Sequence, residues 1–550
     1  MESQRSFLII GLALVSFMLW QQWQVDYGPQ PIEPIAEQAL LPESDTPSVS
    51  STTSVDDSFV PEGDASTVKT TNIDATQRYV KVKTDVLDIT IDLIGGDVVD
   101  ALLIDFPISQ DSDDPFILLQ RDNGIHVAQS GLVGLNGPDA SKDGRPKYQV
   151  QQLNFVLDEN QNEITIPLTW ESDTISVTKL FTIAKGSHDV KVNYDVLNKT
   201  SSPIQIQQYA QLKQTTDADD SSSLFMPTYK GAAYSTEDKR YKKYDFDDIA
   251  DEDLRKSTPA GWVAMLQHYF VAAWVPPQTE TNNLYTKQLR NGDAIIGFTG
   301  SPVNIAANDK VSISTLLYVG PKNQEHLKTL AHGLDLTVDY GPLWFISVYL
   351  FKLLNFLHGL VQNWGLAIIL ITVIVKGLMY PLTKKQYESM AKMRNLAPKM
   401  KQLNDRYGDD RQKKSQAMME LYKKEKVNPM GGCFPILLQM PIFLALYWAL
   451  LESVELRHAG FLWITDLSVQ DPYFIIPILT GLSMFFLQKL QPSTMTDPMQ
   501  QKIMQFMPVA MSIFFFFFPA GLVLYWLVSN VITLVQAKII YASMEKRGLK

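Results

Sequence analysis

The sequence predicts a multi-domain membrane protein, in which a bundle of six transmembrane α-helices is joined to a large antiparallel β-sandwich and a helical hairpin. Three observations predict it. Apolar segments of about bilayer length open the chain and recur after residue 360. Short segments between residues 77 and 320 alternate apolar and polar residues, as antiparallel strands do. Residues 376–550 carry 21 Lys+Arg and 12 Asp+Glu, although the net charge of the chain is −11.

The chain opens with one basic residue, Arg5, and an apolar run from Ser6 to Trp20. The sequence QQWQVDYGPQ that follows lacks the small residues of a cleavage site, so residues 1–24 are predicted to be an uncleaved signal anchor with a cytoplasmic N-terminus. Residues 25–76 are rich in Pro, Ser, Thr, Asp and Glu and are predicted to be a disordered linker.

Residues 77–335 are predicted to form the β-sandwich. Apolar and polar side chains alternate from Leu87 to Leu93, before a turn at Gly95-Gly96, and the same period recurs over residues 190–196. Because one face of such strands is apolar and the other polar, we expect antiparallel sheets that bury one face.

A helix is predicted over residues 340–358, where polar positions fall at spacings of three and four. A helix that is polar along one stripe is expected to lie in the membrane interface rather than to cross the bilayer. The stripe consists of Lys352, Asn355, Gly359 and Gln362.

Five further spans are predicted after this interfacial helix. The last apolar stretch would be about 64 Å long as one helix, twice the thickness of a bilayer core, so it must fold back at Pro519-Ala520-Gly521. The predicted spans are residues 360–382, 433–451, 473–490, 499–519 and 521–541.

The loops between the spans differ in charge. Residues 383–430 hold 13 basic and 6 acidic residues, whereas the only basic residue of 452–472 is Arg457. The positive-inside rule places the first segment, together with 491–498 and 542–550, in the cytoplasm. The loop 452–472 and the β-sandwich then lie outside, in the periplasm if the cell has one.

Lys376 interrupts the apolar run of the second span. A charge at that depth costs roughly 2.5 to 3.5 kcal/mol, so it is usually offset by water, a partner or a function. Two interpretations remain open: its stem snorkels toward the interface, or it lines a hydrated cavity with polar residues of other spans. Polar candidates in the spans are Thr372, Gln439, Ser529 and Asn530.

The segment 383–430 is predicted to be a hairpin of two helices that break near Gly408. Its apolar positions either form the seam between the helices or contact hydrophobic chains, a ribosome or targeting factors, and its basic charges either bind these or only fix the topology. The methionines concerned are Met390, Met393, Met400 and Met418.

Motifs for enzymatic chemistry are missing. Cys433 is the only cysteine, the seven histidines have no metal-ligand spacing, and neither GxSxG nor GxxxxGK[ST] occurs. We therefore expect no enzymatic activity, no metal, no cofactor and no direct nucleic-acid partner.

Four stretches, MYPLTKKQYESMAKM, NPMGGCFPILLQMPIFLALYWAL, TDPMQQKIMQFMPV and FPAGLVLYW, resemble the YidC membrane protein insertases of Gram-negative bacteria. The resemblance covers the whole chain. It implies insertion and folding of inner-membrane proteins, alone or with the Sec translocon, with nascent membrane proteins and the lipid bilayer as partners.

The resemblance also implies a groove, open to the cytoplasm and to lipid, that holds one positive residue. That position matches Lys376, where family members usually have arginine, and the residue after Tyr525, often tyrosine in relatives, is Trp526. We expect the apolar part of a substrate to move along the third and fifth spans. The predicted contact residues are Lys376, Thr372, Gln439, Met440, Pro441, Phe514, Tyr525 and Trp526.

Two functions from other classes are alternatives to an insertase. A solute or ion transporter could use the charged groove, but the spans show no inverted repeat. A passive periplasmic scaffold needs only one anchor, so that five further spans and a basic hairpin would be superfluous.

Overall fold

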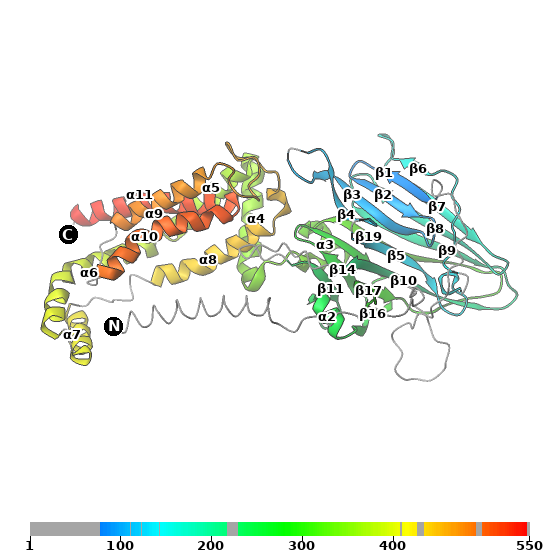
Figure 1. The fold of residues 1–550 in the computed structure, drawn as a ribbon, viewed down its shortest axis with the longest axis horizontal. Coiled ribbons are helices and arrows are strands. Elements are labelled where there is room, and N and C mark those ends of the chain that lie inside the picture. Colours follow the sequence, from blue (N-terminus) through cyan, green and yellow to red (C-terminus); the bar gives the residue numbers. More distant parts are fainter. Residues whose placement is uncertain are drawn as a thin grey trace. The chain divides into compact units, whose positions relative to one another are not determined.

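The computed structural model describes residues 78–546, except 111, 123, 142–143, 217–228, 408–409, 426–433 and 491–497. The predicted signal anchor and linker lie outside the described residues, as does most of the predicted loop 491–498. The described chain is β-rich up to Pro321 and helical after it (Figure 1).

The β domain, defined here as residues 79–337, contains two sheets. In the described part, the first sheet has eleven strands and the second has eight. All pairs are antiparallel except β1 with β6. The main path of the first sheet is β13 (Arg255–Pro259), β16 (Thr281–Gln288), β17 (Asp293–Thr299), β10 (Ile204–Thr215), β5 (His126–Val133), β3 (Asp97–Pro107), β2 (Leu87–Asp92), β1 (Tyr79–Lys83) and β6 (Asn154–Val156), with β18 (Val303–Ile305) beside β10 and β4 (Pro115–Leu119) beside β3. The second is β12 (Lys242–Tyr244), β11 (Gly231–Ser235), β14 (Trp262–Leu266), β15 (Phe270–Val275), β19 (Lys310–Pro321), β9 (Asp189–Asn198), β8 (Ile175–Ala184) and β7 (Glu163–Glu171).

The alternating segments form strands as predicted. Ile89 on β2 and Val192 on β9 are buried and belong to one core that both sheets share. The turn between β2 and β3 needs glycine, since Gly95 and Gly96 have φ of 78° and 67°. Asp92, predicted on the polar face, is buried instead, because its carboxylate pairs with Arg78 at 2.5 Å.

A buried lysine links the two sheets. Lys179 projects from β8 of the second sheet, and its Nζ donates hydrogen bonds to the carbonyl oxygens of Gly95 (3.1 Å), Gly96 (2.8 Å) and Ser130 (2.9 Å) of the first. These acceptors satisfy an ammonium group that is fully buried. The two sheets are therefore joined by hydrogen bonds as well as by apolar packing.

The helices that follow agree with the predicted segments, with shifted ends. After the short α2 (Phe246–Asp251), α3 (Gln324–Leu330) and the 3₁₀ turns η3 (Leu334–Thr337) and η4 (Gly341–Leu343), they are α4 (Trp344–Val361), α5 (Trp364–Leu378), α6 (Tyr380–Tyr407), α7 (Arg411–Lys424), α8 (Phe434–Leu451), α9 (Ile475–Leu490), α10 (Pro498–Phe514) with η7 (Phe515–Phe517), and α11 (Ala520–Lys546). The predicted fold-back at Pro519 separates η7 from α11.

Few of these helices are single spans by length and composition. Among the described residues, Gly341–Val361 and Ala520–Lys546 are long and apolar enough to cross a bilayer. Trp364–Leu378 and Tyr380–Lys392 pass only as a pair, which bends by 60°. Three other apolar helices are shorter, so the six-span arrangement stays a prediction.

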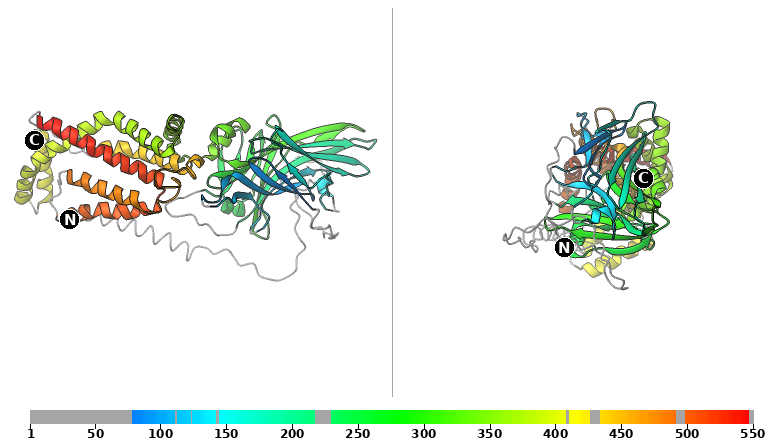
Figure 2. Two further views of the ribbon diagram at one scale, coloured as in Figure 1. Left: turned by 90° about the horizontal axis from the view of Figure 1, so that it is seen from above. Right: turned by 90° about the vertical axis from the view of Figure 1, so that its right-hand side faces the viewer.

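Helix α4 has the composition of a span, although the sequence predicted an interfacial helix. All four residues of its polar stripe are exposed, and so are large apolar residues such as Tyr349 and Phe356. In two views α4 runs across the direction of α5, α9 and α11 (Figures 1 and 2). This direction favours the interfacial interpretation, which stays a prediction.

Helices α6 and α7 lie in the segment where the sequence predicts a helical hairpin, and that arrangement stays a prediction. Asp410 caps α7, because its carboxylate accepts a hydrogen bond from the backbone N–H of Lys413. Lys399 of α6 pairs with Glu425, just after α7, at 2.6 Å. Their cytoplasmic location stays a prediction.

Candidate functional site

The site is centred on Lys376, in the last turn of α5. Its side chain is buried, and its Nζ donates a hydrogen bond to Thr533 Oγ1 of α11 at 3.1 Å. Thr533 Oγ1 in turn donates to the carbonyl oxygen of Ser529 at 2.7 Å, which leaves its lone pairs facing the ammonium group. Gln536 Nε2 donates to the carbonyl oxygen of Lys376 at 3.1 Å. Helix α11 therefore holds this lysine at both its side chain and its backbone.

The charge of Lys376 is not neutralised within the described part of the chain. No ion pair there includes this lysine, and its only side-chain hydrogen bond goes to a neutral hydroxyl. An ammonium group has three N–H donors. Two of them remain for water or for an acceptor brought by another molecule.

Thr372 lies one turn before Lys376 and contributes differently. It is fully buried, and its Oγ1 donates to the carbonyl oxygen of Ile368 in its own helix at 2.6 Å. No hydrogen bond joins it to Lys376 in the described structure. The structure thus supports the helix-packing interpretation for this residue.

The aromatic candidates form a separate cluster. Trp526 of α11 contacts Phe443 of α8 and Phe515 of η7, with ring centroids 4.5 Å and 4.9 Å apart. Tyr525 stacks on Phe443 at 6.2 Å. Since seven residues of helix rise about 10 Å, Trp526 lies about that distance along α11 from Thr533.

The remaining candidates lie on α8 and at the end of α10. Met440 and Phe514 are 46% and 38% exposed, whereas Gln439 and Pro441 are half-buried. No hydrogen bond or ring contact in the described part joins any of these four residues to Lys376. The structure therefore separates the predicted contacts into a polar site at Lys376, an aromatic cluster and residues that contact neither Lys376 nor its partners.

The predicted hairpin contacts are only partly available to a partner. Met390, Met400 and Met418 are half-buried, which fits a seam between helices as well as a contact surface. The side chain of Met393 lies outside the described part.

Sequence reasoning missed Thr533 and Gln536. Ser529, Thr533 and Gln536 follow one another at spacings of four and three, so they share one face of α11. That polar stripe in an otherwise apolar helix was a usable signal. The contact between this face and Lys376 could not be predicted in the same way, because Lys376 and Thr533 lie 157 residues apart in the sequence.

A β-rich domain, joined to apolar helices that bury a charge between them, defines an integral membrane protein with a large domain outside the bilayer. Comparison with known proteins gives the family. Residues 79–353 match the YidC periplasmic domain, and residues 356–547 match the 60Kd inner membrane protein family. This chain belongs to the YidC family.

Relatives match over the full length. The membrane protein insertase YidC of Pseudoalteromonas atlantica is 61% identical, and that of Shewanella pealeana is 53% identical, each match covering 100% of both chains. Among solved structures, an active YidC insertase with its first transmembrane domain resolved matches 86% of this chain and 94% of its own at 18% identity. The TM-score of this match is 0.37.

Proposed function

We propose that this chain is a membrane protein insertase, which inserts integral proteins into the inner membrane and helps them fold, alone or with the Sec translocon. Full-length relatives at 61% and 53% identity are named as insertases. The observation that carries the proposed mechanism is the buried ammonium group of Lys376, whose only side-chain partner in the described part is a hydroxyl. Such a group is suited to a transient anionic partner.

In the proposed mechanism, Lys376 attracts the polar or acidic tail of a substrate. An ion pair is several times stronger in poorly screening surroundings than in water, so one fixed positive charge suffices to favour an acidic tail. Thr533 and Gln536 of α11 hold the lysine in place. Lysine keeps the charge of the usual arginine but not its planar fork of donors, so we expect it to attract charge without bidentate geometry.

The apolar part of the substrate supplies the free energy. We propose that it passes the exposed side chains of Met440 and Phe514, beside Pro441 within α8, on its way into lipid. Burial of about twenty apolar residues at roughly −0.3 to −0.6 kcal/mol each gives on the order of −6 to −12 kcal/mol. Insertion therefore needs no nucleotide and no covalent chemistry.

The remaining proposals concern topology and partners. We propose six spans, with both termini and the hairpin of α6 and α7 in the cytoplasm and the β domain in the periplasm. The hairpin, with its methionines and 13 basic residues over 383–430, is proposed to contact nascent chains, a ribosome or targeting factors.

Photocrosslinking of nascent chains tests the proposal. A photoreactive residue at Met440 should crosslink to a nascent membrane protein, whereas the same residue at Leu462 should not. Leu462 is 77% exposed and follows α8, in the segment proposed to lie outside, so it is the matched exposed control. Equal crosslinking from both positions, or none from Met440, would refute the proposed path.

A further inference from the structure

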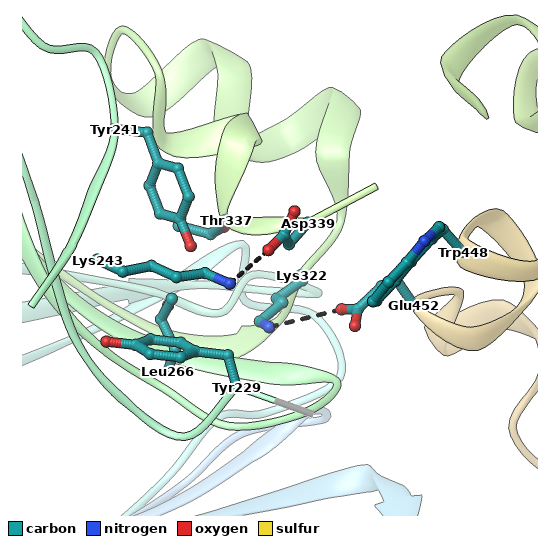
Figure 3. Close-up of a pocket in the computed structure, with 9 residues that line it drawn as sticks. All are labelled: Tyr229, Tyr241, Lys243, Leu266, Lys322, Thr337, Asp339, Trp448 and Glu452. Carbon is teal, nitrogen blue, oxygen red and sulfur yellow. Dashed lines mark hydrogen bonds and ion pairs between the residues drawn. The ribbon is translucent and has the colours of Figure 1, made fainter. Parts of the chain in front are cut away.

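A polar cavity lies between the β domain and the end of α8. Its volume is about 310 Å³, and nine residues line it (Figure 3). Those from the β domain and the turn after it are Tyr229, Tyr241, Lys243, Leu266, Lys322, Thr337 and Asp339, and those from α8 and its end are Trp448 and Glu452.

Most polar groups in the lining already have protein partners. Lys243 pairs with Asp339, whose other carboxylate oxygen accepts from the backbone N–H of Gly341 at 2.9 Å. Tyr229 donates to the carbonyl oxygen of Ala232 at 2.6 Å. These groups therefore need no hydrogen-bond partner from a ligand.

Two donors in the lining have no hydrogen-bond acceptor among the described residues. The hydroxyl of Tyr241 is buried without a hydrogen-bond partner. The ammonium group of Lys322, only 3% exposed, has a single partner, the Glu452 carboxylate 3.9 Å away, which is too far for a hydrogen bond.

The two donors face one space. Figure 3 shows the Tyr241 hydroxyl and the ammonium groups of Lys243 and Lys322 directed into the cavity, with the carboxylate of Glu452 opposite Lys322. A buried donor without an acceptor costs free energy, so these two donors around one cavity favour an acceptor-rich occupant. A phosphate group has acceptor oxygens on several sides and a negative charge that matches Lys322.

We propose that this cavity binds a phosphate group, with Lys322 and Tyr241 as its donors. The carboxylate of Glu452 borders the same space and disfavours a bare anion. A group that carries an ammonium beside its phosphate satisfies both Lys322 and Glu452. The expected ligand class is therefore phosphoethanolamine, as found in a phospholipid headgroup.

The surroundings fit a lipid source. Trp448 ends an apolar helix, the position where tryptophan marks the membrane interface. Its ring packs on Gly341, where an added Cβ would lie 3.0 Å from the indole. The adjoining first turn of α4 exposes Trp344 and Phe345 by 60% and 51%, a surface on which acyl chains can lie.

The test uses the full-length, delipidated protein in a phosphate-free glycosidic detergent. Binding is measured by ³¹P NMR and calorimetry with dihexanoyl phosphatidylethanolamine, dihexanoyl phosphatidylglycerol and inorganic phosphate, and by calorimetry with dihexanoylglycerol as the phosphate-free control. Saturable binding of the phospholipids alone identifies a headgroup site. Equal binding of inorganic phosphate identifies a site for a free anion, which supports phosphate recognition but contradicts phosphoethanolamine as the ligand class.

Two variants test whether Tyr241 and Lys322 donate to the bound phosphate group. Tyr241→Phe removes a hydroxyl that has no protein partner, so folding should be unaffected while the Kd rises about tenfold. Lys322→Met should raise the Kd further, and Lys328→Met, an exposed lysine of α3, is the matched control with unchanged Kd. If Lys322→Met does not fold, Tyr241→Phe carries the test alone.

Three results would overturn the proposal. They are no saturable binding of any phosphate compound, equal binding of dihexanoylglycerol, or a Kd that Tyr241→Phe leaves unchanged. Each would mean that these side chains do not recognise a phosphate group in this cavity.

Discussion

Lys376 of α5 and Thr533 of α11 are joined by a hydrogen bond of 3.1 Å from the ammonium group to Oγ1, deep in the helical region. The bond ties the one charge of α5 to the polar stripe of α11. Because Thr533 also bonds to its own helix, its hydroxyl is oriented before any substrate arrives. The position of the charge thus depends on a second helix.

Replacing Thr533 by valine should weaken insertion without unfolding the protein. Valine keeps the shape but cannot accept from Lys376, and a hydrogen bond to a charged group is worth about 1.5 to 3 kcal/mol, so insertion of an acidic-tailed substrate should fall by about tenfold or more. Thr480→Val is the control, since Thr480 of α9 makes the same bond to its own helix at 2.8 Å away from Lys376. Equal losses in both variants would contradict a role through the lysine.

Lys179→Met should destabilise the β domain. The change removes the ammonium donor from three carbonyl oxygens. Those of Gly95 and Ser130 keep the guanidinium of Arg145 at 3.5 Å and 3.2 Å, so only that of Gly96 loses its side-chain donor, and the expected cost is about 1 to 3 kcal/mol. Thermal unfolding followed by tryptophan fluorescence should show a lower Tm, whereas Lys191→Met, at an exposed position of β9, should not. An unchanged Tm for Lys179→Met would show that the sheets are held by apolar packing alone.

The burial of His268 beside the end of α8 should make the protein less stable in acid. Burial, with a smaller effect of the nearby Lys322, lowers the pKa of His268 to about 4, and its Nε2 lies 3.0 Å from the carbonyl oxygen of Leu451. As the pH falls from about 6.5 to about 4, the unfolded state takes up the proton first, so stability falls over that window by up to about 3 kcal/mol. The Tm should therefore drop between pH 7 and pH 5.

His268→Gln tests this assignment. Glutamine keeps an N–H donor for Leu451 but does not titrate, so the drop in Tm between pH 7 and pH 5 should become smaller. His332→Gln, at an exposed position, is the control and should keep the full drop. A pH dependence that is the same in both variants would assign it to other groups.

Local patterns predicted much of the fold. Alternation from Leu87 to Leu93 predicted β2, and Pro519 predicted the break before α11, because strand period and helix breaking depend on neighbouring residues. The bend of 60° between α5 and α6 was not predicted, although Gly377 and Pro381 flank Met379 and mark a possible helix break. The apolar run over residues 360–382 was interpreted as one span from its hydrophobicity alone.

Only part of the candidate site could be predicted, because contacts between distant helices leave no local pattern. A lysine in an apolar run is visible in the sequence, so Lys376 was found, but its partner Thr533 is set by the packing of two distant helices. The cavity lined by Lys322 and Glu452 was missed in the same way. Contacts between residues more than a hundred positions apart leave no periodic signal in one sequence.

The central claim is that Lys376 attracts the acidic part of a substrate. Reversing the charge of both this residue and the substrate tail tests it most directly. Insertion into liposomes that contain the purified protein is measured for a short-tailed substrate and for its variant with Lys in place of the tail Asp. The account predicts that Lys376→Glu inserts the acidic-tailed substrate poorly and regains insertion with the basic tail, while the unchanged protein shows the opposite preference. Equal insertion of both tails by Lys376→Glu would contradict it.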